Sequence, residues 1–286
     1  QDYQLQLVPQ MLRELRPDLT IGFYLHIPFP PAELFSQLPW RRQILEGLLG
    51  ADLIGFQLPD ASGNFVRLVR NRVGHKTHRD RIFLPDDRTV RAAPFPIAID
   101  TAGYEALAAS PEVEQRVQEI KAAAGGRSIF LGIDRLVGRL NGDLGSIGSP
   151  LISYLHSSYP REEMAALYRA ADVMVVTPYR DGMNLVAKEY VACRLQGDGA
   201  LVLSEFAGAA EELRQAWLVN PYDINGMKVA LIEAYRADPK ELQRRMRAMR
   251  RTVGENDVAM WATSFMEALA SGPGEHLKPM RAARKS

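Results

Sequence analysis

The stretch from Ala171 to Arg194 carries the residues whose types and spacing are best suited to chemistry. An Asp181-Gly182 turn and Asn184 separate an apolar run from a helix-forming segment, in which Glu189 follows. A turn ahead of a helix leaves backbone N–H groups without partners, and these groups favour an anion such as phosphate. The carboxylate of Glu189, one helical turn further on, could accept two hydrogen bonds from vicinal hydroxyls. The spacing therefore indicates a nucleotide-like ligand, although an ordinary strand–turn–helix unit with a polar turn has the same pattern.

The elements that must position these residues are predicted from the local sequence. The apolar run Val173–Val176 indicates a strand buried on both faces, and Thr177-Pro178 ends it because proline has no N–H for a ladder. Asn184 is a good N-cap for the following helix. The first turn of that helix, residues 185–187, contains no acid that would occupy the anion site, and Leu185 and Glu189 share one helical face.

The same stretch also resembles a known protein family in its amino-acid sequence. Residues 180–194, RDGMNLVAKEYVACR, resemble the donor-site signature of the trehalose-6-phosphate synthases almost residue for residue. The segments HIPFP at 26–30, SEFAGAAEEL at 204–213 and VNPYD at 219–223 also resemble that family. Its members are retaining glycosyltransferases. The resemblance implies an α/β fold with two facing Rossmann-like domains, the B-type glycosyltransferase fold.

The order of strand and helix signals indicates the same architecture. A length of 286 residues suits about two domains, and two successive series of strand–helix units predict two Rossmann-like domains with a cleft between them. We expect residues 1–99 to form part of the acceptor-side domain. Residues 100–286 should form the nucleotide-sugar-binding domain and a C-terminal helix. Because the motifs fall on both halves, the complete site is expected only when the cleft closes.

The apolar periodicity predicts the individual elements. Strands are expected at residues 20–27, 51–57, 95–100, 128–133, 150–155, 173–176, 200–203 and 218–223, the last with a capped helix after it. Helices are expected at 3–16, 34–49 with a break near Pro39, 64–73, 112–124, 160–170, 185–194, 240–253 and around Trp261–Leu269.

The chain is expected to be incomplete at its N-terminus and internally. It opens at Gln1 without a start methionine. Residues 132–136, GIDRL, pass within a few positions to 138–142, GRLNG, whereas a long insert separates these segments in the resembled family. Residues 78–91 look compressed in the same way.

Composition excludes several classes of partner. The chain has 35 basic and 34 acidic residues, a net charge of +1, so nothing indicates a nucleic acid or an anionic membrane as partner. The basic segment 240–251 is interpreted as the outer face of an amphipathic helix, because apolar residues recur in it at helical spacing. The single cysteine, Cys193, fits a reducing compartment, and no apolar run has the length of a membrane span. We therefore expect a cytoplasmic protein.

Other chemistries leave no sign in the sequence. There is no G-x-S-x-G, H-E-x-x-H, C-x-x-C or GK[ST] motif. His75 and His78 lie about one turn apart but lack a third ligand nearby, so we expect no metal and no cofactor.

Three residues are predicted to act directly on the transferred glucose or its leaving group. His26 lies near the C-terminal end of the strand expected at 20–27, and the prolines that follow it predict a rigid loop. The resemblance places His26 against the sugar; a core histidine bonded to backbone is the alternative. Arg135 lies at the end of the strand expected at 128–133 and is suited to a diphosphate, the alternative being a surface salt bridge. The resemblance assigns Asp181 to the donor glucose. The lysine that shares the diphosphate in the family is not found here.

The resemblance also implies the wider site. Donor-binding positions are Arg135, Tyr159, Asp181, Gly182, Met183, Asn184, Leu185, Val186, Ala187, Lys188 and Glu189, with Tyr159 contacting the base largely through its backbone. Asp2, with its neighbour Tyr3, corresponds to the acceptor site. The expected reaction transfers glucose from a nucleotide-diphosphate glucose, UDP-glucose favoured over GDP-glucose, to glucose 6-phosphate. A transferase with a cyclitol phosphate acceptor and a catalytically silent homologue are the alternatives. A homo-oligomer is expected.

Overall fold

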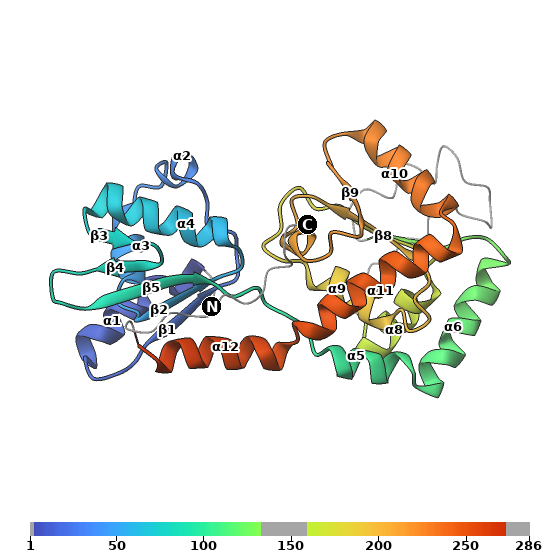
Figure 1. The fold of residues 1–286 in the computed structure, drawn as a ribbon, viewed down its shortest axis with the longest axis horizontal. Coiled ribbons are helices and arrows are strands. Elements are labelled where there is room, and N and C mark those ends of the chain that lie inside the picture. Colours follow the sequence, from blue (N-terminus) through green and yellow to red (C-terminus); the bar gives the residue numbers. More distant parts are fainter. Residues whose placement is uncertain (1–2, 133–158, 273–286) are drawn as a thin grey trace. The chain divides into compact units, whose positions relative to one another are not determined.

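The structure, a computed structural model, describes residues 3–132 and 159–272 and divides into two compact units (Figure 1). The first unit comprises residues 1–99, 181–184 and 256–286, and the second comprises 100–180 and 185–255. These units differ from the predicted domains in two respects, because residues 181–184 and the C-terminal helix both belong with the first unit. Its Trp261 and Phe265 pack on the sheet of that unit. The functional division into 1–99 and 100–286 stays a prediction.

The first unit is built on a mixed sheet. Its strands lie in the order β1-β2-β5-β4-β3, and β1, β2 and β5 are parallel, with Gly22 opposite Leu53 and Leu53 opposite Arg91. The bounds are β1 (Gly22–Leu25), β2 (Leu53–Phe56), β3 (Lys76–His78), β4 (Arg81–Phe83) and β5 (Thr89–Pro94). The hairpin β3–β4 pairs antiparallel to β5 at the edge of the sheet.

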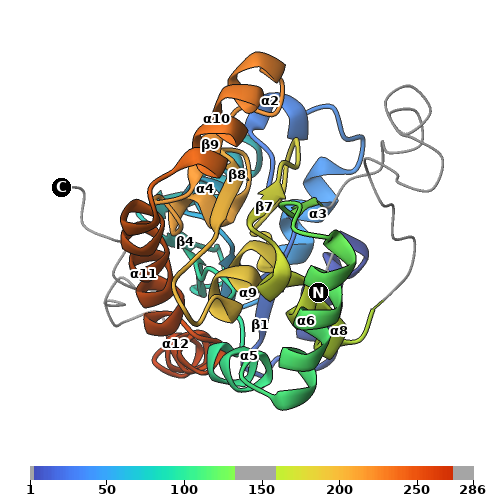
Figure 2. The same ribbon diagram turned by 90° about the vertical axis from the view of Figure 1, so that its right-hand side faces the viewer.

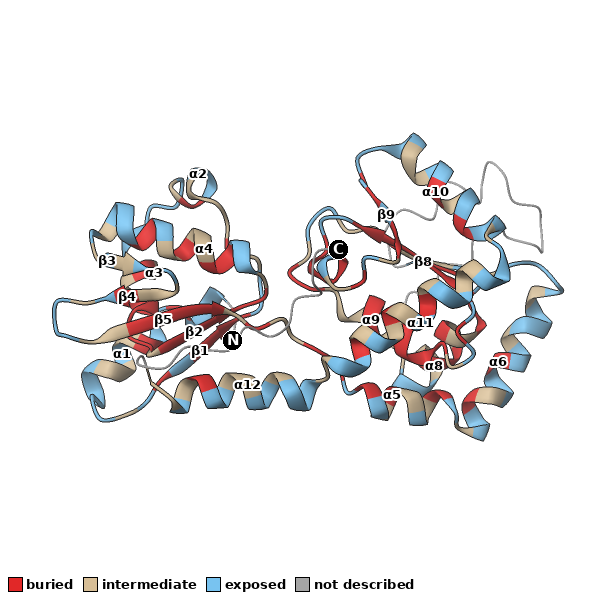
Figure 3. Cartoon of the chain, viewed as in Figure 1, coloured by how far each residue is buried: buried red, intermediate tan, exposed pale blue. Residues whose placement is uncertain are grey.

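Helices cover both faces of this sheet. They are η1 (Tyr3–Leu5), α1 (Val8–Leu15), α2 (Ala32–Phe35), α3 (Arg41–Leu48), α4 (Pro59–Leu68), η2 (Val69–Val73) and α12 (Val258–Ala270). Figure 3 shows the buried strands between them. One core contains side chains of α3 and α4, such as Leu45 and Phe65, and α12 contributes Ala268 to the other. Position 55 in β2 requires glycine, because a Cβ there would lie 2.6 Å from the ring of Tyr24 and 2.8 Å from that of Phe265.

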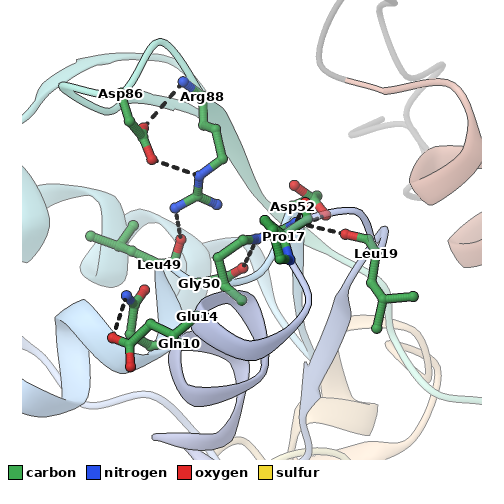
Figure 4. A network of polar contacts seen from close by, with 10 residues as sticks. Gln10, Glu14, Pro17, Leu19, Leu49, Gly50, Asp52, Asp86 and Arg88 are labelled. Atoms are coloured by element: carbon green, nitrogen blue, oxygen red, sulfur yellow. Dashed lines mark hydrogen bonds and ion pairs between the residues drawn. The ribbon is translucent and has the colours of Figure 1, made fainter.

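An arginine ties the first helix to the segments that lead into two strands, and Figure 4 labels four of its partners, Pro17, Leu19, Gly50 and Asp52. Arg13 of α1 donates to the carboxylate of Asp52 at 2.6 Å, and the same carboxylate oxygen accepts the N–H of Ile21 at 2.7 Å. Arg13 also donates to the carbonyls of Pro17, Leu19 and Gly50. The chain segments that enter β1 and β2 are thereby fixed to each other.

The second unit contains a fully parallel sheet. Its order is β6-β7-β8-β9, with bounds β6 (Phe130–Gly132), β7 (Val173–Val176), β8 (Ala200–Ser204) and β9 (Trp217–Val219). The carboxyl ends of all four strands therefore lie at one edge, where ligands bind in α/β folds.

Helices lie on both faces of the parallel sheet. They are α5 (Thr101–Ala108), α6 (Pro111–Ala124), α8 (Arg161–Ala170), α9 (Leu185–Cys193), η3 (Gly208–Glu211), α10 (Ile224–Arg236) and α11 (Pro239–Glu255). The helix α10 packs on one face through Ala230 and Ala234, against Val173, Val202 and Trp217. Successive strand residues point to opposite faces, and Met174, beside Val173, is also buried. The helix α9 packs against β7 and β8, and α5 and α8 pack against α9 (Figure 2).

Most of the expected elements are confirmed, and one is wrong. The sequence predicted a strand at 95–100, but β5 ends at Pro94 and residues 95–99 form no strand. The apolar residues there are interrupted by Pro96, which has no N–H for a ladder, and the carbonyl of Phe95 accepts the indole N–H of Trp261 instead. Asp100 caps α5 by accepting the N–H of Gly103. The strand expected at 150–155 lies outside the described residues.

The basic segment 240–251 lies within α11, which is amphipathic. Met246, Met249 and Val253 of α11 are buried, which confirms the amphipathic interpretation of the basic segment. Within residues 3–132 and 159–272, no helix has both the length and the hydropathy to cross a membrane.

Candidate functional site

His26 directly follows β1, at the C-terminal end of the predicted strand, and the residue is exposed. Its ring meets that of Tyr24 edge-on, with centroids 4.8 Å apart and an angle of 68° between the planes. Its carbonyl accepts a hydrogen bond from Nε2 of Gln57 at 3.4 Å. The backbone at His26 is therefore held to the adjacent strand end, while the side chain is accessible to a ligand.

A buried aromatic cluster and a glutamine fix the loop that carries His26. Phe29 of the HIPFP segment is buried against the rings of Phe35, Phe56 and Phe65, with centroids 5.0–5.7 Å away. Oε1 of Gln57 lies 2.7 Å from the hydroxyl of Tyr24. The prolines predicted a rigid loop, and the structure adds this packing to the rigidity.

The Asp181 side chain shapes the loop that precedes α9. Its Oδ1 accepts the N–H of Met183 at 3.0 Å, and its Oδ2 accepts the side-chain amide of Asn184 at 3.1 Å. Asn184 has a φ of 70°, a left-handed conformation that asparagine tolerates better than most residues. Each carboxylate oxygen has a further lone pair. The carboxylate of Asp181 is thus held in place by the turn, and its role toward the donor glucose stays a prediction.

Gly182 brings two of the predicted site segments together within the first unit. A Cβ at this position would lie 2.5 Å from the carbonyl oxygen of His26 and 3.4 Å from Cδ of Pro28. Real Cβ atoms do not approach a backbone oxygen so closely, so only glycine fits. The loop at 181–184 and the loop after β1 therefore touch at a point where the sequence has no alternative residue.

The first residues of α9 differ in exposure. Leu185 and Val186 are half-buried, and the first turn contains no acidic residue, as predicted. Lys188 is buried, and its ammonium nitrogen lies 2.8 Å from the carboxylate of Glu212. The side chain of Lys188 thus takes part in an ion pair inside the unit, and its role as a donor-binding position stays a prediction. Glu212 was missed by the sequence argument, although it lies in the SEFAGAAEEL segment.

Glu189 is half-buried and is held by two tyrosines. The hydroxyl of Tyr168 in α8 donates to Oε2 of Glu189 at 2.9 Å. Tyr104 of α5 is also hydrogen-bonded to Glu189, and burial together with this bond raises the pKa of Tyr104 to about 12. Burial and the charge of Glu189 raise the pKa of Tyr168 as well. Both phenols therefore act as donors. From the sequence, Tyr168 was predicted only as part of the helix at 160–170, although a buried tyrosine hydroxyl generally has a polar partner.

The remaining predicted residues are spread over the chain. Tyr3 begins η1 and is exposed, and Tyr159 is half-buried just before α8. Asp2 and Arg135 lie outside the described residues. In the two described ranges, no group of three or more histidine, cysteine, aspartate or glutamate side chains could hold a metal ion.

Comparison with known proteins shows which family the chain belongs to. A model of glycosyltransferase family 20 matches residues 1–137 and, separately, 133–271. A trehalose-6-phosphate synthase of Mycolicibacterium vanbaalenii is 48% identical, over 95% of this chain and 68% of the relative. That alignment extends over 333 residues, more than the 286 of this chain, so the relative contains segments that this chain lacks. The two separate family matches meet at 133–137, where the sequence predicted a missing segment.

Two solved structures closely resemble the structure of this chain. An α,α-trehalose-phosphate synthase (UDP-forming) from Burkholderia xenovorans, in complex with glucose-6-phosphate, has a TM-score of 0.87 and 33% identity, over 94% of this chain and 72% of the other. An E. coli protein bound with UDP-2-fluoro glucose has a TM-score of 0.87 and 30% identity, over 94% and 71%. The α/β architecture and the resemblance inferred from the signature segments are therefore confirmed. The chain is a glycosyltransferase and belongs to glycosyltransferase family 20.

Proposed function

We propose that this chain transfers glucose from a nucleotide-diphosphate glucose to glucose 6-phosphate with retention, forming trehalose 6-phosphate in trehalose biosynthesis. The observation that carries the proposal is the segment from Asp181 to Glu189. It combines a turn whose glycine packs on His26, a helix start without acids, and a carboxylate held one turn later. The Burkholderia and E. coli structures, which hold glucose-6-phosphate and UDP-2-fluoro glucose, support the choice of substrates.

The proposed chemistry moves one glycosyl group between two oxygens. The bond from the anomeric carbon to the diphosphate oxygen breaks, and a bond from the same face to the acceptor hydroxyl forms, while the departing phosphate takes the acceptor proton. Negative charge grows on the diphosphate, and the N–H groups at the start of α9 and the guanidinium of Arg135 stabilise it. His26 and Asp181 hold the glucose, and Glu189 holds the ribose. The reaction needs no pair of carboxylates acting as nucleophile and acid.

A competition assay tests the proposal. The chain is incubated with UDP-, GDP- or ADP-glucose and glucose 6-phosphate, and nucleoside diphosphate release and the anomeric configuration of the product are measured. We expect acceptor-dependent release and an α,α-linked product. Release with a cyclitol phosphate in place of glucose 6-phosphate would favour the sibling transferase. Absence of release with any donor, while the donors still bind, would favour a silent homologue.

The donor base is the finer part of the proposal. UDP-glucose is favoured because the Burkholderia xenovorans relative is a UDP-forming enzyme. A preference for GDP-glucose in the competition assay would change the donor and leave the reaction class intact. A cytoplasmic location, proposed from the single cysteine, and a homo-oligomer belong to the proposal as well.

Arg135 offers a direct test of the leaving-group step. Arg135→Ala should lower kcat by roughly 10²–10³, the scale for one preorganised group facing developing charge. Lysine should restore only part, because a point charge does not reproduce a two-pronged contact. If Arg135→Ala raises only the donor KM, the arginine contributes uniform binding instead.

A further inference from the structure

Three helices of the second unit meet at one carboxylate. Glu189 of α9 is half-buried, and the hydroxyl of Tyr168 from α8 lies 2.9 Å from its Oε2. Tyr104 of α5 bonds to the same carboxylate. The side chains of Tyr168 and Tyr104 are almost completely enclosed, with exposed fractions of 1% and 8%. The two donors therefore come from the protein interior, while the acceptor extends to the surface.

The groups around Glu189 are themselves held in place. The guanidinium of Arg161 lies 4.6 Å from the ring centroid of Tyr104, a cation–π contact that fixes the ring. On the preceding residue of α9, Lys188 forms its buried ion pair with Glu212 at 2.8 Å. Contacts on two neighbouring side chains prevent α9 from rotating about its axis, so the direction of the Glu189 side chain is set from both sides.

The number of acceptor positions on Glu189 suits a diol. An ionised carboxylate has about four lone-pair positions. Two phenol hydroxyls use two of them, and the remaining two match the vicinal hydroxyls of a ribose. A glutamate side chain is flexible, and ordering it on ligand binding has an entropic cost. Here the tyrosines order it before the ligand arrives.

We propose that Tyr168 and Tyr104 are positioning residues for donor binding, which hold the Glu189 carboxylate in the orientation that accepts the ribose hydroxyls. This inference rests on the proposed function, because it takes Glu189 as the ribose-binding group. Tyr168 makes the larger contribution, since it is the more deeply buried of the two.

The experiment compares two nucleotides that differ only at the ribose. Isothermal titration calorimetry measures the binding of UDP and of its 2′,3′-dideoxy counterpart to the wild-type chain and to Tyr168→Phe, Tyr104→Phe and Glu189→Gln; GDP and its counterpart are used if the competition assay selects GDP. Tyr168→Phe should weaken UDP binding by about 3- to 10-fold, the scale of one ordinary net hydrogen bond. It should change binding of the dideoxy nucleotide by less than about 2-fold. Tyr104→Phe should show the same pattern with a smaller factor.

Tyr190→Phe is the matched control. Tyr190 also lies on α9 and is fully buried, and its hydroxyl has no side-chain hydrogen-bond partner in the described part of the chain. The substitution removes the same atom from the same helix without touching Glu189, so both nucleotides should bind as they do to the wild type. In kinetics, the Tyr168 variant should raise the donor KM and leave kcat and the acceptor KM within about 2-fold of wild type.

The outcomes separate this inference from the proposed function. Equal losses for UDP and the dideoxy nucleotide in Tyr168→Phe would show a general structural role and overturn the inference. Unchanged UDP binding in both tyrosine variants, together with a loss in Glu189→Gln, would overturn it as well, with the ribose role of Glu189 intact. If Glu189→Gln itself binds the two nucleotides as the wild type does, the ribose assignment within the proposed function is wrong.

Discussion

The two ends of α9 are built in opposite ways. At its start, Leu185 and Val186 are half-buried, and no acidic side chain lies in the first turn. At its end, Val191, Ala192 and Cys193 are all buried, with exposed fractions of 1% or less. The first two residues are thus partly accessible to solvent, whereas the last three are enclosed by the protein.

The polar groups around the enclosed end of α9 are satisfied by hydrogen bonds within the protein. Arg194 follows the last turn of α9, and its Nη1 donates to the carbonyls of Tyr168, Arg169 and Ala171, which α8 leaves without helical partners at its own end. Its Nη2 also pairs with Asp198 at 2.7 Å. The protein thus satisfies its own polar groups around the end of α9. In the proposed function the donor diphosphate binds at the other end of this helix, so we infer that the helix is anchored at the end away from its ligand.

The largest expected effect is at the enclosed end. Arg194→Ala removes several hydrogen bonds to buried carbonyls, and it should lower the free energy of unfolding by roughly 3–5 kcal/mol, as for other broken buried charge networks. Urea denaturation measures it. Arg251→Ala on the exposed surface of α11 is the control, expected within about 0.5 kcal/mol of wild type. A loss below about 1 kcal/mol for Arg194→Ala would contradict the anchoring role.

The turn before α9 should respond in both stability and activity. Gly182→Ala places a Cβ against the carbonyl of His26, so we expect a loss of about 1–3 kcal/mol in unfolding free energy, as for overpacked sites. Turnover should fall as well, because the loop must shift. Gly63→Ala in α4 is the matched control, since nothing lies within 4 Å of its added Cβ, and it should be neutral or stabilising. Wild-type stability in Gly182→Ala would show that the two loops are not closely packed.

These two contrasting regions also show what the sequence could predict. The strand Val173–Val176 and the start of the helix after Asn184 were located correctly, because Pro178 and Gly182 mark the boundaries locally. The hairpin of β3 and β4 was not predicted, since its strands have three residues each and are partly exposed. Short strands of that kind lack the alternation that identifies a buried strand.

The candidate site was predicted only as far as local spacing extends. Asp181, Gly182 and Glu189 were found because they lie in one segment. The partners that hold the helix were missed, because Tyr168 lies 21 residues from Glu189 and Glu212 lies 24 residues from Lys188. Pairs at such distances are brought together by the packing of helices on the sheet, which no local pattern shows.

The His26 loop gives a smaller expected effect that concerns only the reaction. His26→Ala should lower kcat by about 10-fold or more while changing nucleoside diphosphate affinity little, because the imidazole is proposed to bind the glucose and not the nucleotide. Steady-state kinetics and calorimetry measure the two quantities. His78→Ala, an exposed histidine of β3, is the control and should change neither. Equal losses in kcat and affinity for His26→Ala would instead indicate a role in folding.

The last expected effect is a loss of stability at high pH that comes from α9 and its neighbours. Burial raises the pKa of Cys193 from 9.0 to about 12, and burial with the Glu189 bond raises that of Tyr104 from 10.0 to about 12. Between about pH 9 and 12, the unfolded chain therefore releases protons that the folded chain retains. The unfolded state then binds fewer protons, so the free energy of unfolding must fall as the pH rises through this range.

Urea denaturation between about pH 8 and 11 measures this slope. Cys193→Ala should flatten it from about pH 9 upward, and Tyr104→Phe only from about pH 10, because each variant removes one group that titrates differently in the two states. Tyr222→Phe is the control, since Tyr222 is 70% exposed, and it should leave the slope unchanged. A slope that none of the buried-group variants alters would mean that the enclosed end of α9 does not retain its protons, and the contrast between the two ends would then rest on packing alone.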